Sequence, residues 1–280
     1  MGASRRAEPL GARNARIADL RRLVERRSHR EATGRFVVDG PVLLAEALAT
    51  GLVVEVFADV DALGVGGRLG GAVEQARSRN VPVIPVASGV LARVADPVTP
   101  QPVVAVVNRP PTATPDAVVA QGRGVLVADS LADPGNLGTL VRVAEAAGLG
   151  AVWCVGEGTD PFGPKAVRAS AGSVLRLPIA VDSDAGAAVA ALGAHGCTVV
   201  GLRGDGTPYD AAALTRPVAL VVGSEAHGIS GAVAPLVDEW VGIPMLGDVE
   251  SLNAGVAGAV VALEIARRSR TGSGPAGGAR

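Results

Sequence analysis

The sequence predicts an α/β protein of two domains. Its 280 residues exceed the size of one small domain, since domains usually span roughly 100 to 200 residues. Short valine-rich runs alternate with amphipathic segments along most of the chain, which is the pattern of strands alternating with helices. A proline-rich stretch, residues 109–116 (RPPTATPD), interrupts this alternation and has no apolar periodicity. We therefore expect a linker over residues 109–120 between two α/β domains.

The first predicted domain, residues 1–108, begins with an amphipathic helix over residues 14–27. Ile17, Leu20, Leu23 and Val24 share one face of this helix and arginines occupy the other. Further helices are expected at residues 41–49, 70–78 and 88–94, and strands at 36–38, 53–58, 81–86 and 103–107. Pro41 suits the first turn of its helix. The domain should be small, compact and of mixed α/β structure.

The second predicted domain covers residues 121–270. Strands are expected at residues 124–129, 151–155, 175–180, 198–202, 218–222 and 240–243, and helices at 137–147, 185–194 and 252–268. Continuous apolar strands of this kind are typical of a parallel sheet covered by helices on both faces. The glycine-rich residues 271–280 are expected to form a disordered tail.

Charge is distributed unevenly along the chain. The formal net charge is only −1, and 48% of residues are hydrophobic, as in an ordinary globular protein. Residues 1–35, here called the basic arm, contain ten arginines and four acids and carry +6, so the remainder carries −7. The arm suits contact with a polyanion, but a solvated helix face would have the same composition.

Several classes of site are disfavoured. The only lysine, Lys165, lies between Pro164 and Ala166, which excludes a phosphate-binding loop ending in Gly-Lys-Ser/Thr. Cys154 and Cys197 lie in apolar stretches without a nearby ligand pair, so we expect buried thiols and no metal. The sequence shows neither a signal peptide nor a membrane segment, and a soluble, cytoplasmic protein is expected.

Ligands of open α/β sheets bind at the carboxyl ends of the strands, which directs attention to three loops. The first, residues 129–142, contains Gly135, Asn136 and Gly138 at the start of a helix and Arg142 one turn further along. Such a helix start suits a phosphate or a ribose. A capped turn with Arg142 in a surface ion pair is the alternative.

The other two loops follow later strands. The second is residues 223–228 (GSEAHG), with Gly223, Glu225 and His227, where glycines allow either close approach to a ligand or a tight turn. The third is residues 243–253 (IPMLGDVESLN), in which Ser251 is expected to cap the last helix. Glu250, Ser251 and Asn253 would gather polar side chains at that helix start.

Taken together, the three loops resemble the motifs of a known enzyme family. The matching residues are Asn136, Gly138 and Arg142 in the first loop, Gly223, Glu225 and Gly228 in the second, and Ile243, Pro244, Met245, Ser251, Leu252 and Asn253 in the third. The set resembles the SpoU (TrmH-like) family of S-adenosylmethionine-dependent RNA ribose 2′-O-methyltransferases. The basic helix, Arg30, Gly34, Phe36 and the VDGP turn resemble that family's small substrate-binding domain.

The resemblance implies a fold, a cofactor and a set of site residues. The second domain would be an α/β trefoil knot, and the first would resemble a ribosomal protein. The protein would be a homodimer in which the partner's first motif completes each active site. S-adenosylmethionine would be held by Gly223, Ile243, Met245 and Leu252, and the catalytic residues would be Arg142, Asn136, Glu225, Ser251 and Asn253.

The resemblance further implies methylation of ribosomal RNA, with 23S rRNA as the expected substrate. One branch of the family confers self-resistance to ribosome-targeting antibiotics. A tRNA ribose methyltransferase and a non-catalytic RNA-binding protein remain the alternatives. The arginine matching Arg142 is the family's candidate base, but a guanidinium holds its proton tightly, so Arg142 would instead orient a phosphate or stabilise the developing alkoxide.

Overall fold

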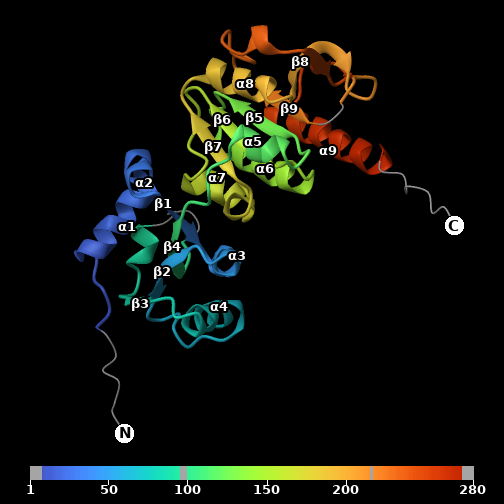
Figure 1. Ribbon diagram of the computed structural model, residues 1–280. Helices are drawn as coiled ribbons and strands as arrows, with labels where there is room; N and C mark the ends of the chain where they lie inside the picture. The colour runs from blue at the N-terminus through green and yellow to red at the C-terminus, as the bar shows by residue number, and fades with distance from the viewer. Residues whose placement is uncertain (1–7, 95–99, 215–216, 273–280) are drawn as a thin grey trace, which may run out of the picture. The chain divides into compact units, whose positions relative to one another are not determined.

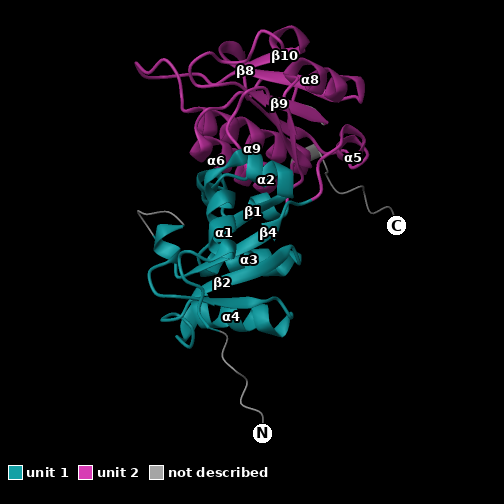
Figure 2. Cartoon of the chain, turned by 90° about the vertical axis from the view of Figure 1, so that its left-hand side faces the viewer, with its two compact units in different colours: residues 1–110, 162–176 teal, residues 111–161, 177–280 magenta. Residues whose placement is uncertain are grey.

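The chain folds into two compact units. The computed structural model describes residues 8–94, 100–214 and 217–272. Unit 1 comprises Met1–Pro110 together with Phe162–Arg176, and unit 2 comprises Pro111–Pro161 together with Leu177–Arg280 (Figure 2). The predicted α/β class is confirmed. Our expected domains differ from these units in one segment, since we placed residues 162–176 within the second domain.

Unit 1 is built on a four-stranded mixed sheet in the order β1-β4-β2-β3. β4 is antiparallel to β1 and β2, whereas β2 and β3 are parallel. The elements in chain order are α1 (Ala15–Glu25), α2 (Arg27–Thr33), β1 (Arg35–Asp39), α3 (Pro41–Thr50), β2 (Val53–Asp59), α4 (Gly67–Ser78), β3 (Val83–Val86), the 3-10 helix Leu91–Arg93, β4 (Val103–Asn108), α7 (Pro164–Ala169) and the 3-10 helix Ser173–Leu175.

The predicted amphipathic helix is α1. Ile17, Leu20 and Leu23 are buried in one cluster with residues of the sheet such as Phe57. The Asn14 side chain accepts a hydrogen bond from the Arg16 N–H at 2.9 Å and so caps the helix start. Burial of the apolar face leaves the arginine face of α1 to solvent.

The segment 162–176 is held to the rest of unit 1 by specific contacts. Arg168 forms an ion pair with Asp39 at 3.0 Å, and Arg176 pairs with Glu46. The Phe162 and Phe36 rings lie with centroids 5.2 Å apart. These contacts come from residues more than 120 positions apart in the sequence, which is why no local pattern predicts them.

Unit 2 is built on a six-stranded parallel sheet in the order β10-β8-β9-β5-β6-β7. Its elements are α5 (Pro115–Val119), β5 (Val125–Asp129), α6 (Pro134–Ala146), β6 (Ala151–Val155), β7 (Ile179–Asp182), α8 (Ala185–Ala194), β8 (Thr198–Pro208), β9 (Val218–Val222), the 3-10 helix Ala234–Leu236, β10 (Glu239–Gly242) and α9 (Ala254–Gly272). Helices lie on both sides of the sheet (Figure 1), so the predicted parallel, doubly covered arrangement is confirmed.

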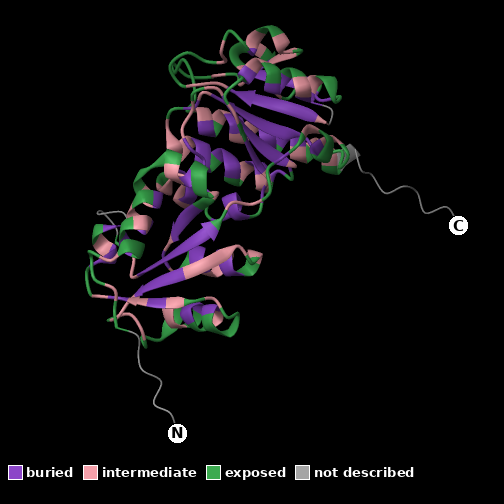
Figure 3. Ribbon diagram, turned by 60° about the vertical axis from the view of Figure 1, so that its left-hand side comes forward, coloured by how far each residue is buried: buried purple, intermediate pink, exposed green. Residues whose placement is uncertain are grey.

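The core of unit 2 explains its valine-rich strands. β5, β6 and β9 are buried at every position (Figure 3). Alternate residues, such as Val125 and Val127, join one cluster with Val189 and Leu192 of α8. α6 and α9 pack against each other and against the sheet. Cys154 and Cys197 are both buried, as predicted. Within the described residues no helix has both the length and the apolar character needed to cross a bilayer.

Some predicted elements were wrong in detail. The helix expected at residues 88–94 is only a 3-10 turn, Leu91–Arg93, and the strand expected at 175–180 begins at Ile179. The expected extended linker contains α5, because Thr114 caps a helical turn that starts at Pro115 and Val118 packs into the core of unit 2. α9 continues to Gly272, and the remainder of the expected tail lies outside the described residues.

Candidate functional site

A cavity of about 710 Å³ lies in unit 2, beside the middle of β8, where β9 and β10 end and α9 begins. This is the carboxyl edge of the parallel sheet, where the predicted loops converge. Seven of the nine predicted site residues line it: Gly223, Glu225, Ile243, Met245, Ser251, Leu252 and Asn253. The second and third loops therefore form one site.

Asn136 connects the first loop to the second. Its side-chain amide Nδ2 donates a hydrogen bond to Glu225 Oε1 at 2.5 Å, although the two residues are 89 positions apart. The Asn136 backbone N–H is occupied by the Asp133 carboxylate at 2.9 Å, which caps α6. This N–H is thus already satisfied and is not available to an anion, and the group of Asn136 that contacts the second loop is its side-chain amide.

The second loop is a tight turn, here called the GSEAHG turn (residues 223–228). Ser224 and Gly228 exchange two backbone hydrogen bonds of 2.9 Å. A Cβ atom on Gly223 would lie only 2.2 Å from the Gly228 carbonyl carbon. Gly223 is therefore required by the closeness of the two sides of the turn. His227 is exposed on the turn.

The third loop differs from the expectation at the start of α9. Asn253 Oδ1 accepts hydrogen bonds from the N–H groups of Gly255 (2.9 Å) and Val256 (3.3 Å), so Asn253 caps the helix. The prediction that Ser251 is the cap was wrong by two residues, since α9 begins at Ala254. The exposed Ser251 hydroxyl has no hydrogen-bond partner among the described residues and remains available to a ligand.

Two small residues bring α9 against α6. A Cβ atom on Gly255 would lie 3.3 Å from Asn136 Oδ1, and one on Gly258 would lie 2.5 Å from Leu140 Cδ2. Glycine at both positions lets the helix starts approach closely. As a result, Asn136 lies beside Asn253, which lines the cavity.

Arg142 is the exception among the predicted residues. It is exposed on α6, does not line the cavity, and forms no ion pair or hydrogen bond with any described residue. Six positions along a helix separate it from Asn136, which places the two side chains on different faces of α6. The alternative of a surface ion pair for Arg142 is therefore not observed in the described part of the chain.

A fourth segment of the cavity, Leu202–Gly204, was missed. The Arg203 guanidinium lies 4.4 Å from the Trp240 ring centroid and pairs with Asp205 at 2.5 Å. Gly242 accommodates this segment, because a Cβ there would lie 2.9 Å from the Arg203 carbonyl oxygen. The GLRGDG sequence that follows the valine run of β8 is the signal that would have identified it.

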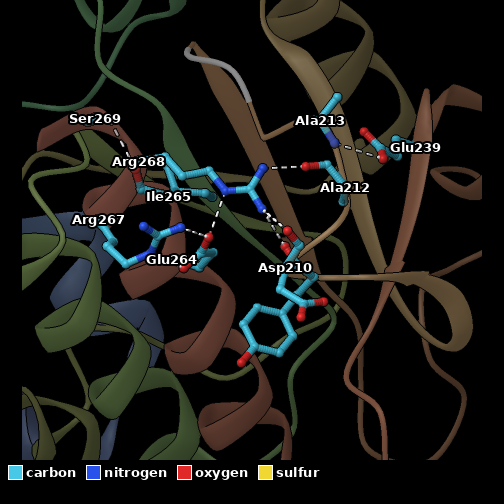
Figure 4. A network of polar contacts seen from close by, with 10 residues as sticks. Asp210, Ala212, Ala213, Glu239, Glu264, Ile265, Arg267, Arg268 and Ser269 are labelled. Carbon is cyan, nitrogen blue, oxygen red and sulfur yellow. Dashed lines mark hydrogen bonds and ion pairs between the residues drawn. The ribbon is translucent and has the colours of Figure 1, made fainter. Parts of the chain in front are cut away.

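The far half of α9 is anchored by a polar network (Figure 4). Glu264 accepts hydrogen bonds from Arg267 and Arg268, and Arg268 also donates to the carbonyl oxygens of Tyr209 (3.1 Å) and Asp210 (2.7 Å). Hydrogen bonds from the two arginines lower the pKa of Glu264 from 4.5 to about 2, although partial burial acts in the opposite direction. The network fixes α9, and Ser251, Leu252 and Asn253 directly precede this helix.

The chemistry of the cavity suits an organic ligand with apolar surface and positive charge. Val222, Val241, Ile243 and Leu252 supply apolar walls, and Glu225 and Glu250 supply negative charge. Within residues 8–94, 100–214 and 217–272 no group of three or more His, Cys, Asp or Glu side chains is placed to hold a metal ion.

Comparison with known proteins identifies the family. The model of the SpoU rRNA Methylase family matches residues 123–263, and that of the MRM3-like substrate binding domain matches residues 14–105. The chain belongs to the SpoU rRNA Methylase family. The SpoU match spans the three predicted motifs, and the predicted family and class of enzyme are confirmed.

Individual SpoU relatives extend over most of the chain. It is 32% identical over 253 residues to the 23S rRNA (guanosine(2553)-2′-O)-methyltransferase RlmP of Bacillus subtilis, covering 89% of this chain and 95% of that protein. The SpoU methyltransferase AviRb from Streptomyces viridochromogenes, solved in complex with the cofactor AdoMet, has a TM-score of 0.83 and 30% identity over 92% of this chain and 99% of its own. An uncharacterized tRNA/rRNA methyltransferase of Mycobacterium sp. (strain KMS) is 40% identical over 166 residues. The matched region covers 57% of this chain and 53% of the mycobacterial protein, so this chain spans about half the length of that relative.

Proposed function

We propose that this protein transfers a methyl group from S-adenosylmethionine to a ribose 2′-hydroxyl of 23S rRNA. The observation that carries the proposal is the Asn136–Glu225 hydrogen bond at the edge of a cavity lined by the other two matched loops. The 23S rRNA assignment is supported by the RlmP relative, which aligns over nearly its whole length. Modification of RNA in bacteria would place the protein in the cytoplasm.

The cavity fits the proposed cofactor. Its volume of about 710 Å³ falls within the range of about 300–1,000 Å³ typical of small-molecule sites. Glu225 and Glu250 face a ligand that carries positive charge on its sulfur and ammonium groups. When bound, S-adenosylmethionine supplies an activated methyl group, so the protein mainly has to orient the acceptor hydroxyl and accommodate its proton.

Each catalytic candidate has an atom available for that task. The second carboxylate oxygen of Glu225 accepts no hydrogen bond from the described residues. The Ser251 hydroxyl and the Asn253 amide nitrogen likewise form no hydrogen bond with a described residue. We assign these groups to positioning the ribose. Gly223, Ile243, Met245 and Leu252 are assigned to the cofactor because they line the same cavity.

We also propose that the protein is a homodimer in which Arg142 acts in the partner's site. Arg142 is exposed, has no partner among the described residues and does not line its own cavity. Val256 and Leu263 expose apolar side chains two helical turns apart on α9, and Leu246 and Val249 do so in the third loop. A second copy of the chain would cover these side chains and bring its own Arg142 to the cavity.

We propose the trefoil knot because of the order of the strands in the sheet of unit 2. β10 lies at one edge of the sheet beside β8, yet α9, which follows it, packs on α6, the helix that follows the central strand β5. The chain thus returns to the middle of the sheet immediately after its edge. A passage through an earlier loop would accommodate that path.

Mixing two inactive variants tests the placement of Arg142. Arg142→Ala should bind S-adenosylmethionine normally yet lose methyl transfer, and Gly223→Ala should lose cofactor binding. If Arg142 acts across the dimer, random re-association of the two should recover about one quarter of wild-type activity, because half of the dimers contain one intact site. An arginine acting within its own subunit gives no recovery, and wild-type turnover of Arg142→Ala alone would remove its catalytic assignment.

The substrate is tested directly with labelled cofactor. Fragments of 23S rRNA and total tRNA would be incubated with the protein, and 2′-O-methylated positions mapped. Incorporation into 23S rRNA at one nucleotide is expected. The tRNA/rRNA name of the mycobacterial relative makes tRNA the second candidate, and incorporation into tRNA alone would establish it. A self-resistance role further predicts that deleting the gene lowers the inhibitory concentration of a ribosome-targeting antibiotic.

RNA contact is assigned to part of the basic arm. Arg5 and Arg6 lie outside the described residues. Of the eight described arginines, Arg30 is buried and donates to the carbonyl oxygens of Leu23 and Val24. Three others are engaged by acids, in the pairs Arg16–Glu55, Arg22–Asp19 and Arg27–Glu31.

The remaining four arginines, here called the free arginines, are Arg13, Arg21, Arg26 and Arg35. None has a hydrogen bond or an ion pair from its side chain to a described residue. They can neutralise phosphates without breaking an existing contact. The match of residues 14–105 to a substrate binding domain supports this role.

A further inference from the structure

Asp129 is a buried carboxylate with no role in the mechanism described so far. It is the last residue of β5 and is 0% exposed. No cation contacts it in the described part of the chain; its partners are the Ser230 N–H at 2.7 Å and the Ser130 hydroxyl at 3.1 Å. Burying a carboxylate is costly unless its oxygens are satisfied, so this arrangement requires both donors to stay in place.

The bond to Ser230 fixes the base of the GSEAHG turn. The chain enters the turn from β9, which is paired with β5 up to Val222 beside Ala128. Two residues beyond the turn lies Ser230, whose N–H donates to Asp129, 101 positions earlier in the sequence. The Ser230 hydroxyl is buried without a hydrogen bond among the described residues. The hydrogen bond from its backbone N–H to Asp129 therefore links this residue to the end of β5.

Ser130 keeps the carboxylate oriented. Its backbone adopts φ +55°, its N–H donates to the Val155 carbonyl oxygen at 3.0 Å, and its hydroxyl donates to Asp129 Oδ1. Gly156 leaves room for this hydroxyl, since a Cβ there would lie 2.5 Å from Ser130 Oγ. The end of β6 therefore supports the end of β5.

These contacts connect the two catalytic loops. Asp129 holds the exit of the turn that carries Glu225, and seven residues further along its own chain lies Asn136, which donates to Glu225. We infer that Asp129 is a positioning residue: it fixes the GSEAHG turn against the end of β5, so that Glu225 and Asn136 meet before any ligand binds. The inference rests on the proposed catalytic role of Glu225. Such preorganisation matters because small displacements of catalytic groups cost large factors in rate.

The principal variant is Asp129→Asn. An amide has one accepting oxygen and no charge, so the bond from the Ser230 N–H becomes weaker, and the Ser130 hydroxyl must turn from donating to Asp129 to accepting from the amide nitrogen. We expect kcat to fall by about tenfold, in line with the loss that misplacement of a catalytic group causes. We also expect weaker binding of S-adenosylmethionine by calorimetry, because Gly223 and Ser224 line the cavity.

A double-mutant cycle with Glu225→Gln separates positioning from general destabilisation. If Asp129 acts through Glu225, the Glu225→Gln substitution should cost much less in the Asp129→Asn background than in the wild type. Multiplicative losses in kcat would overturn the inference.

Hydrogen exchange of residues 224–230 in the ligand-free protein gives a readout that needs no activity. Exchange in this segment should accelerate in Asp129→Asn, and unchanged exchange there contradicts the inference. If the wild type binds cofactor but methylates no RNA, the proposed function is wrong. Hydrogen exchange and cofactor affinity would still test whether Asp129 positions the GSEAHG turn.

Two further variants keep the test decisive. Asp39→Asn removes a half-buried carboxylate of unit 1 that is paired with Arg168, and it should lower thermal stability without changing cofactor affinity or exchange at residues 224–230. If Asp129→Asn does not fold, Ser130→Ala retains the bond to Ser230 and should give a weaker effect that is still non-multiplicative with Glu225→Gln. Independent losses for that pair would overturn the inference in the same way.

Discussion

The division of the basic arm into engaged and free arginines leads to a quantitative prediction about RNA binding. The perturbation replaces the four free arginines, Arg13, Arg21, Arg26 and Arg35, with glutamine. These side chains have no partners among the described residues, so their removal breaks no observed ion pair. The fold should therefore be retained while up to four phosphate contacts are lost.

The size of the effect follows from counterion release. The slope of log affinity against log salt changes by about 0.7 for each phosphate contact to a single strand, so four contacts change it by up to about 3. Between 50 and 200 mM salt, the wild type should consequently lose up to about fifty-fold more affinity than the variant. The measurement is the binding of a labelled 23S rRNA fragment by fluorescence anisotropy at several salt concentrations.

The engaged arginines provide the matched control. Replacing Arg16, Arg22 and Arg27 with glutamine removes a similar amount of charge from the same basic arm, but each of these side chains is neutralised by an acid in the structure. The slope should change by less than for the free set. An unchanged slope in the variant lacking the free arginines would mean that the arm is only a solvated helix face. Equal changes in the two variants would refute the division itself.

Three further predictions concern unit 2. Because the pKa of Glu264 is lowered from 4.5 to about 2 in the folded protein, its contribution to stability is complete above pH 4.5 and is lost as the pH falls toward 2; Glu264→Gln should remove this part of the acid dependence in unfolding experiments. Gly223→Ala should lose at least tenfold in cofactor affinity by calorimetry, since its Cβ would overlap the Gly228 backbone, whereas Gly231→Ala, with open space around the added atom, should bind normally. Asn253→Ala should lower the free energy of unfolding by about 1 kcal/mol through loss of the α9 cap. Ser251→Ala should change stability little while reducing kcat, and the reverse result would restore Ser251 as the cap.

The strands of unit 2 were predictable from the sequence because burial alone determines them. β5, β6 and β9 are buried at every position, and their valine-rich runs coincide with the strands to within a residue. α2 and α7 were missed because they lack an apolar stripe. In α2 the buried residue is Arg30, which satisfies the end of α1, and α7 is held by ion pairing between Arg168 and Asp39. These helices depend on contacts distant in sequence, which no local periodicity records.

In the candidate site, too, the sequence predicts the residues that buried strands position but not those that depend on distant contacts. Residues directly after buried strands, such as Gly223 and Ile243, were located correctly because the end of a strand fixes the position of the residue that follows it. The Ser251 cap was misassigned because serine and asparagine have similar capping strength, so the sequence does not distinguish Ser251 from Asn253, which is the cap in the structure. Asp129 remained hidden because a single acid at a strand end has no local pattern. Its significance depends on Ser230, 101 residues later. Residues that line the cavity can thus be predicted from the strand pattern, whereas a contact such as Asp129–Ser230 becomes visible only once the sheet brings distant segments together.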